Sequence, residues 1–501
     1  MTENLRDPVS LQAGSAPEET AVVVHESGES LTYADLDRAV GETAGRLAAL
    51  GVREGDHVGV LMHSRLAFVR LVHAAARLGT TLVPLNVRLT PAELSSQVER
   101  ADLTLLVCEG DTEAAAVEAA GETPIASVDD PAVDADTSAS IAALAAADPE
   151  PVTPVSRDLD DPRCILFTSG TTGRPKAVVL TVGNLFASAA ASAFRLGVLP
   201  DDRWLDPLPM YHMGGLAPVV RSAVYGTTVV LQRDFDAAAT ADALAERDAT
   251  GTSLVPTMLR RMLDVRDGDG LADSLRFVLL GGAPAPDELV ERCADAGVPV
   301  CPTYGMTETA SQIATARPAE AVDHLGTVGR PLSVTDVTVV GEGGAECAPG
   351  DPGELVVDGP TVTPGYYGDS DATADAFGER GLYTGDVGYV DDGGRLYVLN
   401  RRSDRIVTGG ENVDPGEVAD ALREHPAVRD AAVVGLDDPE WGERVAALIA
   451  GDLDEAVIRD HLDGRLAPYK RPKTIEFADE LPRTASGTVE RETVRDCLAA
   501  D

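Results

Sequence analysis

The stretch Ile165–Lys176 reads ILFTSGTTGRPK, and the interpretation of the whole chain starts from it. Its apolar beginning predicts a buried strand, which runs into a loop with four hydroxyl side chains, two glycines and one lysine. Glycines let a backbone approach a ligand and turn its N–H groups inward as an anion-binding nest. The loop does not fit the P-loop pattern G-x-x-x-x-G-K-[ST]. We therefore predict another kind of phosphate-binding loop, with an ordinary Ser/Thr/Gly linker as the alternative. Its candidate ligands are Thr168, Ser169, Gly170, Thr171, Thr172, Gly173 and Lys176.

Short apolar runs alternate with amphipathic helical patterns over 20–110 and 163–330, which predicts an α/β fold with largely parallel sheet. The Ala-, Asp- and Pro-rich residues 111–160 predict a surface connection with marginal helices. Short strands with glycine turns follow, and the last hundred residues read as a compact α+β unit. The predicted architecture is an N-terminal domain over 1–401, whose residues 331–401 are a small β-rich subdomain, and a C-terminal α+β domain over 402–501.

The charge is strongly acidic, with 83 Asp and Glu against 41 Lys and Arg and a net charge of −42. This argues against nucleic-acid binding, which needs a basic footprint, and against docking on anionic lipid. Lysine is nearly absent: Lys176, Lys470 and Lys473 are the three in the chain. An acidic excess with loss of lysine suits a protein dissolved in concentrated salt, where screening removes self-repulsion. We hypothesise a halophilic source.

No segment of the sequence predicts export or insertion into a membrane. The first ten residues, MTENLRDPVS, lack the basic and apolar regions of a signal peptide. The most apolar stretch, Leu185–Leu199, is interrupted by Arg195 and is too short to span a bilayer. Six scattered cysteines without a C-x-x-C pair are typical of reduced thiols. We expect a soluble, cytoplasmic protein.

A second motif, Thr303–Glu308, reads TYGMTE. We expect a strand to meet the start of a helix here, and a helix N-terminus favours an anion. Thr307 can hydrogen-bond a phosphate, and Glu308 can hold Mg²⁺ against phosphate oxygens. The structural alternative is a capping threonine followed by an acidic residue in the first helical turn.

These motifs resemble those of the adenylate-forming acyl-CoA synthetases, a family that also includes luciferases and adenylation domains. TSGTTGRPK matches the family's phosphate loop, and the resemblance extends from LTYADLD at 31–37 to LPRTASG at 481–487. It implies that a carboxylate attacks the α-phosphate of ATP to give an acyl adenylate and pyrophosphate. A thiol, usually that of CoA, then displaces AMP. The implied ligands are ATP, Mg²⁺ and CoA.

The same resemblance assigns residues around the nucleotide. The small residues of GGAP, after the strand RFVLL, suit a flat base lying on backbone, with a plain βα turn as the alternative. In the YTGD motif, one carboxylate can accept hydrogen bonds from two ribose hydroxyls. An arginine fifteen residues further on is implied to reach the ribose or a phosphate. The implied contacts with ATP or AMP are Gly282, Ala283, Pro284, Tyr304, Asp386 and Arg401.

The resemblance implies that the C-terminal domain is mobile and rotates about a hinge at Ser403 between the two half-reactions. Gly409 and Gly410, in the GGEN segment of that domain, are implied to line the pantetheine tunnel for CoA in the thioester-forming state. An ordinary hairpin turn is the alternative.

The sequence departs from the family at Thr488, where the signature P-R-x-x-x-G-K has its lysine. Losing one preorganised donor costs about 3–4 kcal/mol of transition-state stabilisation. Three interpretations remain open. Arg483 or Arg491 substitutes for the lysine, Lys470 or Lys473 moves in, or the chain adenylates slowly or not at all.

The acid pocket is expected around MYHMGGL, residues 210–216, where His212 matches the family residue at the tunnel mouth. Arg221 follows on a segment that reads as a buried helix, where an arginine must be paired or must meet a ligand. Its planar fork suits a second carboxylate, with an internal salt bridge as the alternative. Ser311 and Gln312, one helical turn past Glu308, are expected to line the same pocket.

The amino-acid sequence around these residues resembles that of the o-succinylbenzoate–CoA ligases of menaquinone biosynthesis. This implies ATP-dependent ligation of 2-succinylbenzoate to CoA, with the succinyl carboxylate adenylated first. The expected catalytic residues are Thr307, Glu308, His212 and Lys176. The alternatives are another aryl- or acyl-CoA ligase, or an adenylate-binding protein with weakened catalysis. We expect small-molecule substrates, no nucleic acid and no membrane insertion, and a homo-oligomer is compatible with the sequence.

Overall fold

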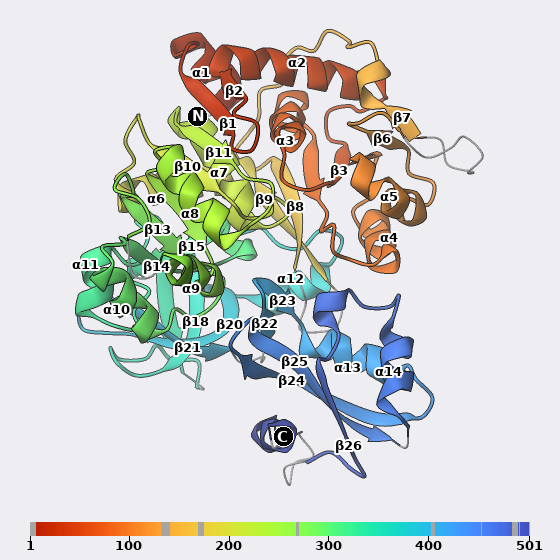
Figure 1. Ribbon diagram of the computed structural model, residues 1–501, viewed down its shortest axis with the longest axis vertical. Coiled ribbons are helices and arrows are strands. Elements are labelled where there is room, and N and C mark those ends of the chain that lie inside the picture. The colour runs from red at the N-terminus through yellow and green to blue at the C-terminus, as the bar shows by residue number, and fades with distance from the viewer. Residues whose placement is uncertain are drawn as a thin grey trace.

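The computed structural model describes residues 7–131, 141–168, 175–266, 270–341, 343–401, 406–451, 453–482, 489 and 491–499, apart from the side chains of residues 400, 401 and 492. Within these ranges the strands form two large sheets covered by helices, a small antiparallel sheet, and a further sheet in the C-terminal region (Figure 1). The predicted α/β fold class is confirmed.

The first large sheet has the strand order β16-β15-β14-β13-β12-β10-β11-β1-β2. Its strands from β14 to β1 are parallel, and two of them, TVVL in β11 and FVLL in β13, are buried along their whole length, which is typical of a parallel sheet covered on both faces. The strands are β1 (Thr20–Val24), β2 (Ser30–Thr32), β10 (Arg203–Asp206), β11 (Thr228–Leu231), β12 (Gly251–Leu254), β13 (Phe277–Leu280), β14 (Val300–Met306), β15 (Ser311–Thr315) and β16 (Arg330–Pro331).

The second large sheet has the order β7-β6-β5-β3-β4-β8-β9, with its final pair antiparallel. That pair flanks residues 169–174, so the expected phosphate loop joins two neighbouring strands. The strands are β3 (His57–Leu61), β4 (Thr81–Pro84), β5 (Leu105–Cys108), β6 (Ile125–Ser127), β7 (Ile141–Ala143), β8 (Pro162–Thr168) and β9 (Lys176–Thr181).

Helices of the large domain begin at local signals that the sequence carries. At α4, for example, the Thr90 hydroxyl and the Glu93 carboxylate form a capping box, and Pro91 occupies the first helical position. The α-helices are α1 (Pro8–Ser15), α2 (Tyr33–Ala49), α3 (Leu66–Leu78), α4 (Pro91–Arg100), α5 (Glu113–Ala119), α6 (Val182–Leu196), α7 (Met213–Tyr225), α8 (Ala237–Glu246), α9 (Pro256–Val265), α10 (Asp287–Asp295), α11 (Pro318–Asp323) and α12 (Ser370–Ala376). The short 3₁₀ helices of the large domain are η1 (Gly110–Thr112), η2 (Leu144–Ala146) and η3 (Thr307–Thr309), and η4 (Pro468–Lys470) belongs to the C-terminal region.

The small antiparallel sheet corresponds to the predicted β-rich subdomain. Its strands are β17 (Asp336–Val340), β18 (Gly353–Asp358), β19 (Phe377–Gly378), β20 (Gly381–Val390) and β21 (Leu396–Arg401).

The C-terminal sheet lies below α4 in Figure 1, in blue, with its own apolar core around Ile406, Val433 and Ala447. Its strands are β22 (Ile406–Thr408), β23 (Glu411–Val413), β24 (Val428–Asp438), β25 (Gly442–Gly451) and β26 (Thr474–Ala478), with helices α13 (Pro415–Arg423), α14 (Glu455–Leu462) and α15 (Arg491–Leu498). One sheet ends at Arg401 and the next begins at Ile406. The domain boundary at 401/402 stays a prediction, and its neighbourhood, including Ser403, lies outside the described residues.

The structure differs from the sequence analysis at residues 111–160. Besides the short helix α5, this segment contributes β6 and β7, which pair in parallel at the edge of the second sheet. Strands of three residues are too short to show a periodic pattern, and this hid them. Among the described residues, no helix combines the length and apolarity needed to cross a membrane.

Candidate active site

A cleft of about 1640 Å³ lies between the large and small domains and is lined by both. It brings together most of the residues that the sequence singled out, although they come from distant segments. The predicted site residues that line it are Thr168, His212, Arg221, Gly282, Ala283, Pro284, Tyr304, Thr307, Glu308, Ser311, Gln312, Asp386, Gly409 and Gly410.

Tyr304 and Asp386, assigned to adenine and ribose, are joined by a hydrogen bond. The Tyr304 hydroxyl donates to Asp386 Oδ2 at 2.6 Å, and both side chains are buried. Tyr304 comes from β14 and Asp386 from the middle of β20, so two sheets meet at this contact. The backbone of Arg401 lies opposite Asp386 in the β20–β21 pairing, while its side chain is outside the description.

Glu308 is held by a tyrosine that the sequence analysis did not select. The Tyr366 hydroxyl donates to Glu308 Oε1 at 3.2 Å, and the Lys176 ammonium lies 4.6 Å from the centre of the Tyr366 ring. Only 5% of Glu308 is exposed, and it lines the cleft. Carboxylate oxygens are the ligands that Mg²⁺ prefers, so this acid fits the metal expected beside the phosphates.

The expected helix after Thr303–Glu308 is wrong. A 3₁₀ turn over Thr307–Thr309 is followed directly by β15, which runs back antiparallel to β14. A Cβ at Gly305 would lie 1.6 Å from the Ser311 carbonyl oxygen, so this close approach requires glycine. Ser311 and Gln312 therefore reach the cleft from a strand, not from a helical turn.

The centre of the phosphate loop cannot be placed, because Ser169, Gly170, Thr171, Thr172 and Gly173 lie outside the described residues. The two ends are described. Thr168 ends β8 and pairs across the ladder with Lys176, which starts β9.

Arg221 is a buried cation that contacts neutral side chains. It lies on α7 with 6% exposure, and it donates to Gln312 Oε1 at 3.0 Å and to Ser188 Oγ at 2.8 Å. In the described part of the chain, no acidic side chain forms an ion pair with it, and burial lowers its pKa. The internal salt bridge considered above is thus absent there. A buried guanidinium in this setting favours an anionic partner.

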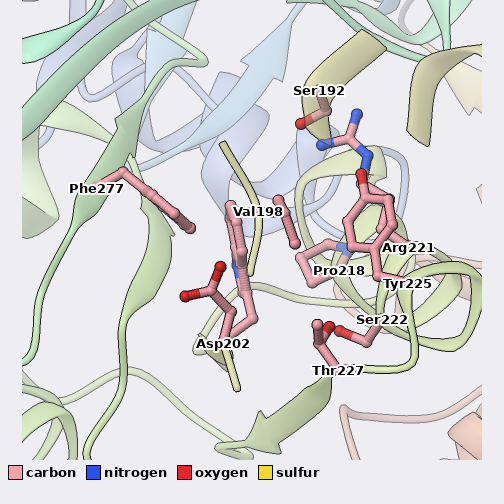
Figure 2. Close-up of a pocket in the computed structure, with 10 residues that line it drawn as sticks. Ser192, Val198, Asp202, Pro218, Arg221, Ser222, Tyr225, Thr227 and Phe277 are labelled. Carbon is pink, nitrogen blue, oxygen red and sulfur yellow. The ribbon is translucent and has the colours of Figure 1, made fainter. Parts of the chain in front are cut away.

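The surroundings orient the Arg221 side chain toward the cleft. Gln312 donates from its Nε2 to Thr315 Oγ1 at 2.8 Å, which leaves its Oε1 facing Arg221. Ser188 donates to the Ala310 carbonyl and so presents its lone pairs to the guanidinium. Arg221 also borders a second cavity of about 10 Å³, shown in Figure 2, beside Ser192 and Tyr225. That cavity has room for about one water molecule, so the cleft is the space available to a substrate.

Glu411 of the small domain contacts His212 and Arg88 of the large domain. His212 Nε2 lies 2.9 Å from Glu411 Oε2, and Arg88 donates to Glu411 Oε1 at 3.0 Å. Asn86 donates to the same carboxylate at 3.3 Å. Burial alone would raise the pKa of Glu411, but His212 and Arg88 outweigh it and hold that pKa below its ordinary value. The carboxylate is therefore ionised at neutral pH.

Gly409 and Gly410 form the turn that leads into Glu411. The Gly409 N–H donates to the Trp441 carbonyl at 2.7 Å, and both glycines have positive φ. A Cβ at Gly409 would lie 2.7 Å from the Trp441 ring. This turn lines the cleft beside Val255, and its expected role in binding CoA stays a prediction.

Which residue replaces the lysine that is absent at position 488 stays an open question. Thr488 and Arg483 lie outside the described residues, and Arg491 starts α15. Lys470 is buried between Glu93 and Glu417, and Lys473 lies 3.9 Å from the centre of the Trp441 ring. In the described arrangement both lysines are thus engaged elsewhere.

The sequence analysis missed Tyr366 and Ser188 as supports of the site, and it gave Glu411 no role. Neither Tyr366 nor Ser188 belongs to a sequence motif, so no pattern pointed to them. Glu411 could have been selected from the sequence, since it directly follows the two glycines of GGEN.

The chain belongs to the family of AMP-binding enzymes. The AMP-binding enzyme model matches residues 9–367, and the model of the AMP-binding enzyme C-terminal domain matches residues 417–488. Within that family, a 2-succinylbenzoate–CoA ligase of Bacillus licheniformis is 41% identical over 483 residues, which are 96% of this chain and 97% of the relative.

A solved relative, the o-succinylbenzoate CoA synthetase of Bacillus subtilis, has been captured in several complexes. A double mutant bound to the product analogue OSB-NCoA gives a TM-score of 0.91 at 36% identity, covering 98% of this chain and 99% of that one. The complex with the acyl-adenylate OSB-AMP gives 0.76 at 35% identity, covering 98% of each chain. The complex with ATP and magnesium gives 0.75 at 35% identity, covering 99% and 100%.

Proposed function

We propose that this AMP-binding enzyme is a 2-succinylbenzoate–CoA ligase of menaquinone biosynthesis that works through an acyl adenylate. The observation that carries the substrate assignment is Arg221, a buried guanidinium held by two neutral side chains at the wall of the cleft. A dicarboxylic acid supplies the missing anion with one carboxylate and offers the other for reaction. Fatty acids and simple aryl acids have no second carboxylate to offer. The 41% identical relative supports the same substrate.

In the first half-reaction, a carboxylate oxygen attacks the α-phosphorus of ATP and pyrophosphate leaves with the electrons of the broken P–O bond. Tyr304, Asp386 and the turn at Gly282–Pro284 hold the nucleoside, together with Arg401. Thr307, Lys176 and the loop over 168–173 bind phosphate oxygens. Glu308, fixed by Tyr366, holds the Mg²⁺ that neutralises phosphate charge when it is bound.

In the second half-reaction, the CoA sulfur attacks the acyl carbon and AMP leaves. Gly409 and Gly410 border the path of the pantetheine arm, and His212 stands at its end, turned toward Glu411. The TM-score of 0.91 with the OSB-NCoA complex, against 0.75–0.76 with the two nucleotide complexes, supports assigning the described domain arrangement to this step.

The decisive assay gives the purified protein 2-succinylbenzoate, ATP, Mg²⁺ and CoA, and measures AMP, pyrophosphate and the thioester. We expect all three products in equal amounts. AMP formed with other aryl acids but not with this one would favour the alternative of another acyl-CoA ligase. A thermal shift with ATP but no AMP from any acid would favour the adenylate-binding alternative that Thr488 raises.

The substrate role of Arg221 is tested by Arg221→Met, which keeps the volume and removes the charge. Charged hydrogen bonds contribute about 1.5–3 kcal/mol each, so we expect the KM for 2-succinylbenzoate to rise roughly tenfold to a hundredfold. The KM for ATP should change little. The matched control is Arg38→Met, at an exposed arginine of α2. Equal increases in both KM values would contradict a role in binding the acid.

Three broader expectations complete the proposal. The net charge of −42 and the scarcity of lysine support a protein adapted to concentrated salt. Full stability in salt-free buffer would refute that adaptation. The scattered free cysteines, four of them buried, support a reducing, cytoplasmic setting. Whether the protein forms a homo-oligomer is tested by sedimentation at the salt concentration used in the activity assays.

A further inference from the structure

Lys470 is a buried cation that joins the two domains. Its ammonium lies 2.7 Å from Glu93 Oε1, on α4 of the large domain, and 2.8 Å from Glu417 Oε1, on α13 of the small domain. The side chains are 5%, 11% and 12% exposed, respectively. Burial by itself would lower the pKa of Lys470, but Glu417 and Glu93 outweigh it and raise that pKa, so the side chain stays charged.

The charges of the two domains make such a bridge necessary. Residues 1–401 carry 60 acidic and 28 basic side chains, and residues 402–501 carry 23 and 13. Two strongly acidic bodies repel each other when they approach, and water excluded from their contact weakens the screening of that repulsion. A cation between a carboxylate of each domain converts this local repulsion into attraction.

The two ion pairs of Lys470 respond differently to a rotation of the small domain. Glu417 belongs to the same domain as Lys470, so that pair moves as a unit. Glu93 belongs to the large domain, and its capping box with Thr90 fixes it to the start of α4. A rigid rotation of the small domain therefore breaks the Glu93 pair and preserves the Glu417 pair.

We propose that Lys470 and Glu93 are positioning residues for thioester formation alone: their ion pair stabilises the described domain arrangement and contributes nothing to adenylation. This rests on the proposed assignment of that arrangement to the CoA-dependent step. The lysine thereby gains a function in a chain that has nearly eliminated lysine. In the described arrangement its ammonium is held by Glu93 and Glu417, so here it acts through the position of the small domain.

The test is Glu93→Gln, assayed on each half-reaction separately. Glutamine still satisfies the capping box, so helix α4 is retained. Adenylation is followed by pyrophosphate release in single turnovers without CoA. Thioester formation is followed by mixing the preformed enzyme–adenylate complex with CoA. We expect adenylation to stay within twofold of the wild type and the CoA-dependent step to slow about tenfold, which corresponds to about 1.4 kcal/mol.

The matched control is Glu99→Gln, which removes the same charge from an exposed position on the same helix. It should leave both steps unchanged. Three outcomes would overturn the proposal: Glu93→Gln slows both half-reactions alike, slows neither, or slows the CoA-dependent step no more than Glu99→Gln does. If the wild type forms no thioester at all, the proposed function fails instead, so the two failures are distinguishable.

A second pair of variants addresses the lysine itself. Lys470→Arg keeps the charge and should retain most of the CoA-dependent rate, whereas Lys470→Met should lose it. In the Glu93→Gln background, Lys470→Met should slow that step little further, because the pair is already broken. Full additivity of the two substitutions would overturn the proposal, and the result from Glu93→Gln stands even if Lys470→Met does not fold.

Discussion

The two halves of the cleft are built from different interactions. The side that we propose for the nucleotide contains contacts within the large domain, such as Tyr304 with Asp386 and Tyr366 with Glu308. The side that we propose for CoA contains ion pairs that cross from one domain to the other, through Glu411 and Lys470. The first set survives a movement of the small domain, and the second set does not.

This difference separates two tasks of one active site. The nucleotide ligands proposed in the large domain keep their positions relative to one another when the small domain moves. The contacts at the end of the cleft that we propose for CoA belong to the described domain arrangement. Substitutions on the two sides should therefore affect different half-reactions.

The largest effect is expected at Glu308. Glu308→Gln removes the buried carboxylate that we propose to hold Mg²⁺ at the phosphates, and the loss of one such electrostatic contact typically slows the chemical step about 10²–10³-fold. Pyrophosphate release in single turnovers should fall by that factor. Thioester formation from preformed adenylate and CoA should change much less.

The exposed Glu246→Gln, at the end of α8, serves as the control and should leave both rates unchanged. If Glu308→Gln slowed both half-reactions equally, the division between the two sides of the cleft would be incorrect.

The reverse pattern is expected at Glu411. Glu411→Gln keeps the shape but removes the charge that holds Arg88 and His212, and losing one partner of a buried charge pair is costly. We expect the CoA-dependent step to slow at least about tenfold, equivalent to 1.4 kcal/mol, while adenylation stays near the wild-type rate. Rapid mixing of the adenylate complex with CoA measures the first rate.

The control on the small domain is Glu480→Gln, at an exposed residue that does not line the cleft. A loss of adenylation in Glu411→Gln would show that His212 needs Glu411 in both steps and would refute the separation.

The meeting of the candidate nucleotide ligands at one cleft was largely predictable from the sequence, because each candidate stands in a contiguous motif. Tyr304, Glu308 and Asp386 lie in TYGMTE and YTGD, and the structure gathers these segments at one cleft. Their local conformation was less predictable. The helix expected after Glu308 is absent because the pairing of β14 with β15 overrides a capping pattern that favours a helix.

The CoA side was predictable only in part. The glycine turn at Gly409 and Gly410 is a local feature, but its neighbour Glu411 obtains its partners from far along the chain: Asn86 and Arg88 are more than 300 positions away, and His212 is 199 positions away. The pairing of Lys470 with Glu93 spans a similar separation. No periodicity or motif encodes such contacts, since they depend on how two separately folded domains meet.

A moderate effect is expected from Tyr304→Phe. The substitution removes a hydrogen bond to the Asp386 carboxylate while keeping the ring, and one such bond to a charged group contributes about 1.5–3 kcal/mol. The KM for ATP should therefore rise about tenfold or somewhat more, with a smaller change in the KM for CoA. Steady-state titration of each substrate measures both values. A larger increase in the KM for CoA than in the KM for ATP would contradict a role of Tyr304 in binding the nucleotide.

The smallest effect on catalysis is expected at Glu109, which belongs to an ion network inside the large domain. This carboxylate is 1% exposed and accepts hydrogen bonds from the His63 backbone N–H at 2.7 Å and from Arg65 at 2.8 Å. Arg233 reaches it at 3.3 Å from the other large sheet. Since neither sheet moves with the small domain, Glu109→Gln should lower the stability of the fold and leave the ratio of the two half-reaction rates unchanged.

The pH dependence of stability tests whether charge holds this network. Burial would raise the pKa of Glu109, but the hydrogen bonds from His63 and Arg65 outweigh it and lower that pKa below the ordinary 4.5. The unfolded chain therefore takes up this proton first as the pH falls, so the stabilisation is complete above 4.5 and is lost below it. We expect the Tm of the wild type to exceed that of Glu109→Gln by about 5 °C at pH 7, with the gap closing below pH 4.5. A gap that widens on acidification would mean that Glu109 is protonated in the folded protein, and the network would then not be held by charge.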